Sequence, residues 1–207
     1  MTDHVTRLST ADPDFETGFA ALLSAKREVS EDVDAAVRAI LKDVADNGDA
    51  AVAALTRRFD RVDVEAVGMR FSEAEMERAE SAVAAEERAA LELARDRIAA
   101  YHLRQKPADA SYVDETGVHL GWRWTPVESA GIYVPGGTAA YPSSVLMNAI
   151  PARVAGVPRV AMAVPTPDGL VSPLVLVAAR IAGVDEIYRI GGAQAVAALA
   201  YGTETIR

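Results

Sequence analysis

Two pairs of adjacent glycines, Gly136-Gly137 and Gly191-Gly192, each stand between a short apolar segment and a segment with helical character. Glycine carries no Cβ and adopts positive φ at little cost, so the amides of such a turn can face a bound group. The helix that follows offers unpaired N–H donors and the positive end of its dipole. An anionic group is well accommodated at each turn, and two such turns in one α/β unit predict a nucleotide-binding site.

The same glycine pairs are also compatible with tight strand-to-helix turns that bind nothing. No G-x-G-x-x-G string follows either apolar segment, and no acidic residue stands about 20 positions beyond it, so the dinucleotide fingerprint is not met. The glycines alone leave both interpretations open.

Tyr133 and Gln194 are the side chains best placed to contact a ligand at these turns. Tyr133 alternates with Ile132 and Val134, so on a strand it faces the opposite side from both. Gln194 falls in the first turn of the second helix, where its amide can both donate and accept hydrogen bonds. The residue types alone are as compatible with an ordinary aromatic core residue at 133, and they favour a surface glutamine at 194.

The remaining polar candidates are two serines and three histidines. Ser143 and Ser144 stand at the start of the helix after the first turn, where N-capping accounts for them better than phosphate binding does. His4, His102 and His119 fall in a loose tail, on a helix and in a strand, with neither i,i+4 pairing nor an adjoining carboxylate. We expect them to form no zinc site, and His102 to have a structural role.

Composition excludes several classes of function. The net charge is −9, and residues 1–130 hold 26 acids against 16 bases, whereas residues 131–207 hold 4 against 5. This acidity argues against nucleic acid or an anionic membrane surface as a partner. With no cysteine there is no disulfide, thiolate metal site or thiol nucleophile. Prolines and arginines interrupt the most apolar stretch, 145–164, and no basic apolar leader is seen, so we expect a cytoplasmic protein without a membrane span.

Helical periodicity dominates residues 1–130. An apolar stripe from Val33 to Val44 predicts an amphipathic helix, with Ser30 as its N-cap and Asn47-Gly48 as its end. Ser72-x-x-Glu75 predicts a capping box, and a second apolar stripe, Leu91, Ala94, Ile98 and Tyr101, predicts a long helix ending before Pro107. Between 111 and 125 the pattern predicts a β-hairpin that turns at residues 115–117.

From residue 131 onward, strands near 131–135, 158–164 and 186–190 alternate with helices. This order predicts a parallel sheet with right-handed crossovers. The fold class is therefore α/β, with a helix-rich region at 1–130 and an incomplete Rossmann-like nucleotide-binding domain at 131–207. Three strands form only half of a doubly wound sheet, which predicts that the domain is truncated.

Two long strings carry a resemblance to a known family. GIYVPGGTAAYPSSVLMNAIPARVAGV at 131–157 and GGAQAVAALAYGTETI at 191–206 resemble histidinol dehydrogenase, a zinc- and NAD-dependent enzyme. Looser similarity at 53–60, 101–107 and 121–128 extends the resemblance over the chain after a variable amino-terminal stretch. Members of the family are longer, so the chain resembles their amino-terminal half.

The resemblance implies an aldehyde dehydrogenase-like architecture and a two-step, NAD-dependent oxidation of L-histidinol to L-histidine through the aldehyde. It assigns NAD binding to Tyr133 and Gln194, with supporting turns at Pro135, Gly136, Gly137, Gly191 and Gly192. It places the zinc ligands and the catalytic Glu-His pair beyond Arg207, so no catalytic or metal-binding residue is expected in this chain and the isolated chain is expected to be inactive. A homodimer is also implied.

A second hypothesis is a noncatalytic nucleotide-binding or assembly module that keeps the glycine turns without the chemistry. The sequence beyond Arg207 would distinguish the two hypotheses, because only the enzyme needs zinc-ligand histidines and a Glu-His pair there.

Overall fold

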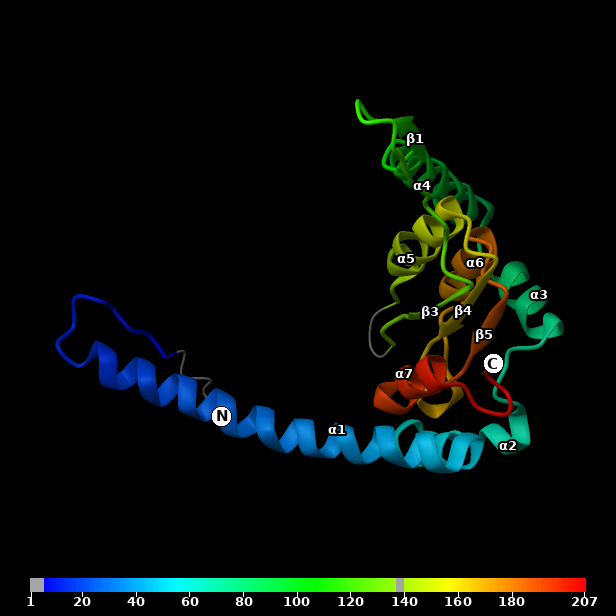
Figure 1. The fold of residues 1–207 in the computed structure, drawn as a ribbon. Helices are drawn as coiled ribbons and strands as arrows, with labels where there is room; N and C mark the ends of the chain where they lie inside the picture. Colours follow the sequence, from blue (N-terminus) through cyan, green and yellow to red (C-terminus); the bar gives the residue numbers. More distant parts are fainter. Residues whose placement is uncertain (1–5, 137–139) are drawn as a thin grey trace.

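The computed structural model describes residues 6–136 and 140–207. Its longest element is helix α1, Phe15–Asp60, which runs along one side of the molecule and extends beyond the body at its amino-terminal end (Figure 1). The expected start at Ser30 is wrong, because Ser30 lies inside the helix. The expected end at Asn47-Gly48 is confirmed in part: Gly48 is non-helical, at φ 52° and ψ −131°, but a second helical stretch follows it directly across a kink.

The kink is held by a distant segment of the chain. The amide of Asp49 donates to Glu204 Oε2 at 3.0 Å, so the backbone group freed at the kink finds a partner near the carboxyl-terminal end of the described chain. Helix-favouring residues on both sides then allow α1 to resume. Local sequence signals show only the break, because the partner lies far away in the chain.

The three helices after α1 include the predicted capping box. They are α2 at Val64–Val67, α3 at Glu73–Ala82 and α4 at Ala85–Leu103. At the start of α3 the Ser72 amide donates to Glu75 Oε2 at 2.8 Å, and the Glu75 amide donates to Ser72 Oγ at 3.4 Å, which confirms the box.

Helix α4 matches the second predicted stripe except at its last member. Leu91, Ala94 and Ile98 pack against the core, whereas the Tyr101 side chain is 61% exposed. The helix ends at Leu103, before Pro107 as expected.

The predicted hairpin is confirmed. Strands β1, Ala110–Val113, and β2, His119–Trp122, pair antiparallel. Asp114 fixes the turn, because its Oδ1 accepts from the amides of Thr116 and Val118, each at 2.9 Å. The hairpin lies beyond the sheet at the far end of α4 (Figure 1).

A parallel three-stranded sheet forms the centre of the molecule, as predicted. Its order is β3-β4-β5, and the elements alternate along the chain as β3 Ser129–Tyr133, α5 Pro142–Ala155, β4 Arg159–Ala163, η1 Pro167–Gly169, α6 Pro173–Ile181, β5 Glu186–Tyr188 and α7 Gly192–Tyr201. The carboxyl ends of all three strands therefore lie at one edge of the sheet, directly before the glycine turns and the 165–169 turn.

Both faces of the sheet are buried. Ile132, Val134 and Met162 join a cluster with α5 and α6, whereas Ala163 and Tyr188 join a second cluster with α7 and the carboxyl-terminal part of α1. Helices α5 and α6 thus cover one face, and α7 with α1 covers the other. Because both faces are covered by helices, the strand sequences are almost continuously apolar.

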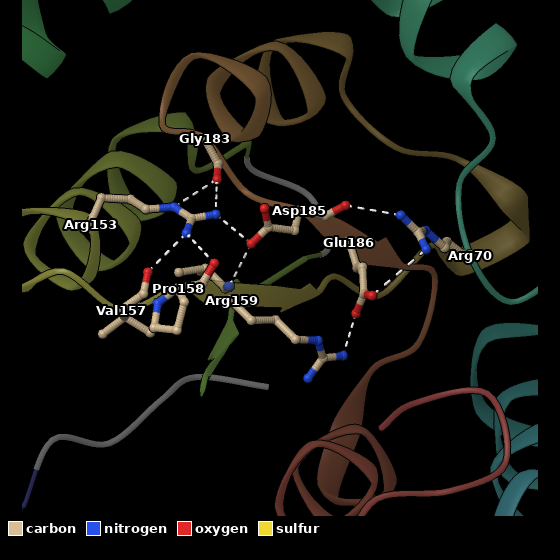
Figure 2. Close-up of polar contacts among 9 residues, drawn as sticks. Arg70, Arg153, Val157, Pro158, Arg159, Gly183, Asp185 and Glu186 are labelled. Atoms are coloured by element: carbon tan, nitrogen blue, oxygen red, sulfur yellow. Dashed lines mark hydrogen bonds and ion pairs between the residues drawn. The ribbon is translucent and has the colours of Figure 1, made fainter. Parts of the chain in front are cut away.

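The opposite, amino-terminal edge of the sheet is fixed by Arg153 (Figure 2). Its guanidinium donates to the carbonyls of Val157 at 2.9 Å, Pro158 at 3.0 Å and Gly183, and pairs with the Asp185 carboxylate. Asp185 in turn accepts from the amide of Val160, and so ties together the loops that enter β4 and β5. One side chain therefore satisfies loop carbonyls that the sheet leaves unpaired.

Within the part of the chain that the structure describes, no helix has the length and apolar character needed to cross a bilayer.

Candidate nucleotide-binding site

Gly136 and the Gly191-Gly192 turn both lie at the carboxyl edge of the sheet, after the two strands that flank β4. The backbone amide of Gly192 donates a hydrogen bond to the Tyr133 hydroxyl at 3.2 Å, which joins the end of β3 to the start of α7. Tyr133 packs on the α7 side of the sheet, opposite to Ile132 and Val134, as its position in the strand predicts. The tyrosine and the second glycine turn therefore belong to one site.

Gln194 lies in the same site and is buried. Its side chain is 1% exposed, so it is not a surface glutamine. A Cβ added at Gly192 would lie 2.7 Å from Gln194 Oε1, which shows that the side chain returns toward the glycine turn. The side-chain amide can both donate and accept hydrogen bonds. Burial strengthens any hydrogen bond that it makes.

The described glycines of the two turns differ in conformation. Gly192 has positive φ, at 66°, whereas Gly191 is extended at φ −131° and ψ −176°. A Cβ at Gly136 would lie 2.5 Å from Pro165 Cγ, and one at Gly191 would collide with Pro165 Cβ. Gly136 and Gly191 therefore leave no room for a side chain on the side of Pro165. Gly137, the other predicted turn residue, lies outside the described residues.

The expected role of the two serines as N-caps is wrong. Helix α5 begins at Pro142, and Tyr141 is the residue before it, so Ser143 and Ser144 lie within the first turn. Proline is favoured at the first helical position because its φ is preset and its missing N–H would be unpaired there in any case. Pro135 and Gly136, which lead toward this helix, are exposed.

The end of β5 is fixed by an arginine that the sequence analysis did not identify. Arg189, two residues before Gly191, is buried, pairs with Glu75 at 2.7 Å and lies over the Phe71 ring at 4.1 Å. Burial alone would raise the pKa of Glu75, but hydrogen bonds from Ser72 and Arg189 outweigh it and lower that pKa to about 2. A charged residue inside the otherwise apolar string IYRIGG was the available signal.

The residues that the structure describes do not fit a zinc ion. Among the described side chains, those of residues 6–24, 32–136 and 140–207, no three from His, Asp or Glu converge as metal ligands. His4 lies outside this range, and His119 is exposed in β2. His102 lines a cavity of about 680 Å³ between α4, the hairpin base and the carboxyl end of α5. That cavity lies toward the amino edge of the sheet, away from the glycine turns.

Fold and site define a mixed α/β protein in which amino-terminal helices precede a small parallel sheet, with two glycine turns joined at its carboxyl edge. A family model described as histidinol dehydrogenase matches residues 23–207, and the chain belongs to the histidinol dehydrogenase family.

Individual relatives agree. The histidinol dehydrogenase of Ruegeria pomeroyi is 66% identical over 199 residues, which cover 96% of this chain and 46% of that protein. The one from Brucella abortus is 63% identical over 203 residues, covering 98% and 47%. The crystal structure of histidinol dehydrogenase from Elizabethkingia anophelis superposes with a TM-score of 0.80 at 32% identity, covering 84% of this chain and 40% of that one. The chain thus spans about half the length of the curated relatives that it matches.

Proposed function

We propose that this chain is the NAD-binding part of a histidinol dehydrogenase that oxidises L-histidinol to L-histidine in two steps through the aldehyde. The observation that carries the proposal is the hydrogen bond from the Gly192 amide to the Tyr133 hydroxyl, at 3.2 Å. It joins the two family-specific strings at the carboxyl edge of a parallel sheet, which is where such sheets bind their ligands.

Several described groups have the chemistry to hold the cofactor. Helices α5 and α7 both begin at this edge, and their first-turn amides suit the anionic part of a nucleotide. Tyr133 and Gln194 would contact the cofactor, while Pro135, Gly136, Gly191 and Gly192 shape the loops around it. NAD, when bound, would supply the hydride acceptor for both oxidation steps. The protein's part here is to bind and orient it.

The position of α7 supports a larger, Rossmann-like sheet. Helices α5 and α6 cover one face while the strand order advances from β3 to β5, whereas α7 covers the other face. With right-handed crossovers, a helix on the opposite face returns the chain to the β3 side, so we propose that a further parallel strand pairs with β3. The turn after β3 would then lie at the topological switch point, where ligands bind. The aldehyde dehydrogenase-like architecture and the division at about residue 130 belong to the same proposal.

The zinc ion and the catalytic acid–base pair are assigned, on family resemblance, to residues beyond Arg207. L-Histidinol as substrate, a homodimer and a cytoplasmic location complete the proposal, and all of them rest on family membership and on similarity to the relatives named above.

The test uses the complete enzyme that contains this chain. Gln194→Ala should raise the KM for NAD about tenfold, the equivalent of one hydrogen bond of about 1.4 kcal/mol, and leave the KM for histidinol within about twofold. Gln105→Ala, at the exposed end of α4, is the matched control. An enzyme that oxidises histidinol with unchanged NAD dependence in Gln194→Ala would contradict the site, and a protein that binds NAD but never oxidises histidinol would favour the noncatalytic module.

A further inference from the structure

Pro165 follows the central strand β4 and lies between the two glycine turns. A Cβ at Gly136 would approach Pro165 Cγ to 2.5 Å and its carbonyl oxygen to 2.8 Å. A Cβ at Gly191 would lie 3.1 Å from Pro165 Cα and collide with its Cβ. The proline ring is therefore in direct contact with the backbone of both turns, one on each side.

The segment that carries Pro165 is fixed before and after the ring. Before it, the Val164 amide donates to the Tyr188 carbonyl at 3.0 Å, continuing the β4–β5 ladder. After it, Thr166 is buried, and its carbonyl accepts from the Gly169 amide at 2.8 Å. Arg61 at the end of α1 then pairs with Asp168 through two bonds of 2.6 Å. These contacts before and after Pro165 hold the ring in place between the two turns.

The backbone geometry shows that contact with Pro165 is what requires glycine at 191. The φ of −131° and ψ of −176° at Gly191 are open to every residue, so conformation alone does not demand glycine there. A rigid ring with preset φ is suited to filling a fixed gap, since little side-chain entropy is lost when it is buried.

We propose that Pro165 is a positioning residue for the cofactor, which sets the separation between the turn after β3 and the turn before α7. The inference rests on the proposed function, because it assumes that NAD contacts Tyr133 and Gln194. The strand that carries Tyr133 and the strand that leads to Gln194 lie on either side of β4, and the bond between Tyr133 and Gly192 spans the same gap. Pro165 itself need not touch the cofactor.

The test removes the ring and then restores the fit. In the complete enzyme, Pro165→Ala should raise the dissociation constant for NAD, measured by titration calorimetry, about tenfold, since small displacements of binding groups cost up to about 100-fold. The KM for histidinol should not change. Gly191→Ala should weaken NAD binding similarly by forcing the turns apart. The double variant Gly191→Ala/Pro165→Gly should bind NAD more tightly than Gly191→Ala alone, because the clashing Cβ is gone.

The matched control is Pro158→Ala, which removes a proline ring at the amino edge of the sheet and should leave NAD binding unchanged. Three results separate the possible failures. If Gln194→Ala weakens NAD binding but Pro165→Ala does not, the positioning role is wrong and the cofactor site stands. If neither variant has an effect, the cofactor site itself is wrong. If Pro165→Ala lowers Tm and affects NAD and histidinol equally, Pro165 is only structural. Should Gly191→Ala fail to fold, Pro165→Ala decides alone.

Discussion

The Tyr133 hydroxyl accepts a hydrogen bond from the Gly192 amide at 3.2 Å, so the end of β3 and the start of α7 share one bond across the site. The amide would otherwise be one of the unpaired donors at a helix start. The Tyr133 side chain therefore accepts a hydrogen bond in addition to packing against its neighbours. Removing the hydroxyl alone tests the hydrogen bond separately from the packing.

Tyr133→Phe keeps the ring and removes the acceptor. We expect a loss of about 0.5–1.5 kcal/mol in the free energy of unfolding, together with a severalfold rise in the KM for NAD in the complete enzyme. Steady-state kinetics and thermal unfolding measure both effects. Tyr112→Phe, on the exposed hairpin, is the control. If both variants changed stability and the KM for NAD equally, the Tyr133 hydroxyl would have no specific role.

The lowered pKa of Glu75 predicts that the folded protein loses stability in acid. Its pKa in the folded state is about 2, against 4.5 for a free glutamate. A lowered pKa contributes stability that is complete above 4.5 and is lost as the pH falls toward 2, and here that contribution is on the order of 3 kcal/mol. Urea unfolding between about pH 6 and about pH 3 should show this slope, and Glu75→Gln should reduce it. Glu77→Gln, an exposed change on the same helix, is the control; a slope unaltered by Glu75→Gln would contradict the assignment.

The hydrogen bonds of Arg153 predict that this side chain stabilises the folded protein and does not affect NAD binding. Lysine cannot reach the carbonyls of Val157, Pro158 and Gly183 together, so Arg153→Lys should cost about 2 kcal/mol in unfolding free energy. The dissociation constant for NAD should stay unchanged, because this network lies at the opposite edge of the sheet (Figure 2). Arg95→Lys, an exposed pair with Asp96, should change stability by less than about 0.5 kcal/mol. A large shift in NAD affinity for Arg153→Lys would show that the two edges are coupled.

The backbone conformation of Gly48 predicts that even a substitution by alanine destabilises the protein. Its φ of 52° with ψ of −131° is unfavourable for alanine, and the new Cβ would lie 2.5 Å from a Glu204 carboxylate oxygen. Gly48→Ala should therefore lose about 1–3 kcal/mol in denaturant unfolding. Gly18→Ala lies inside the same helix without positive φ, and its new Cβ would meet only the flexible end of the Leu8 side chain, at 2.8 Å. It should therefore lose much less stability than Gly48→Ala or gain up to about 1 kcal/mol. The kink would be unimportant if both variants proved stabilising.

The sequence predicted what depends on local patterns. The order of strands and helices after residue 131, the capping box at Ser72 and the hairpin turn at 115–117 all follow from spacing and residue type, and the structure confirms them. The opposite-facing side chains of Tyr133 and Ile132 follow from strand alternation.

Features set by distant contacts could not be predicted. The continuation of α1 past Gly48 depends on Glu204, and the burial of Gln194 depends on how α7 packs against the sheet. The sequence leaves open whether the glycine pairs accommodate a ligand or only form tight turns, and the structure shows that a side chain at Gly136 or Gly191 would collide with Pro165. Nothing next to either glycine in the sequence indicates that proline.

The most direct test of the account is a hydrogen–deuterium exchange footprint of NAD on the complete enzyme. Saturating NAD should slow exchange in peptides covering residues 131–136 and 190–196 together, because the account places both turns against one cofactor. The hairpin at 110–122 should exchange at the same rate with and without NAD. Exchange that is unchanged in both turn peptides, while NAD is bound and protects other parts of the enzyme, would contradict the assignment of Tyr133 and Gln194 to the cofactor site.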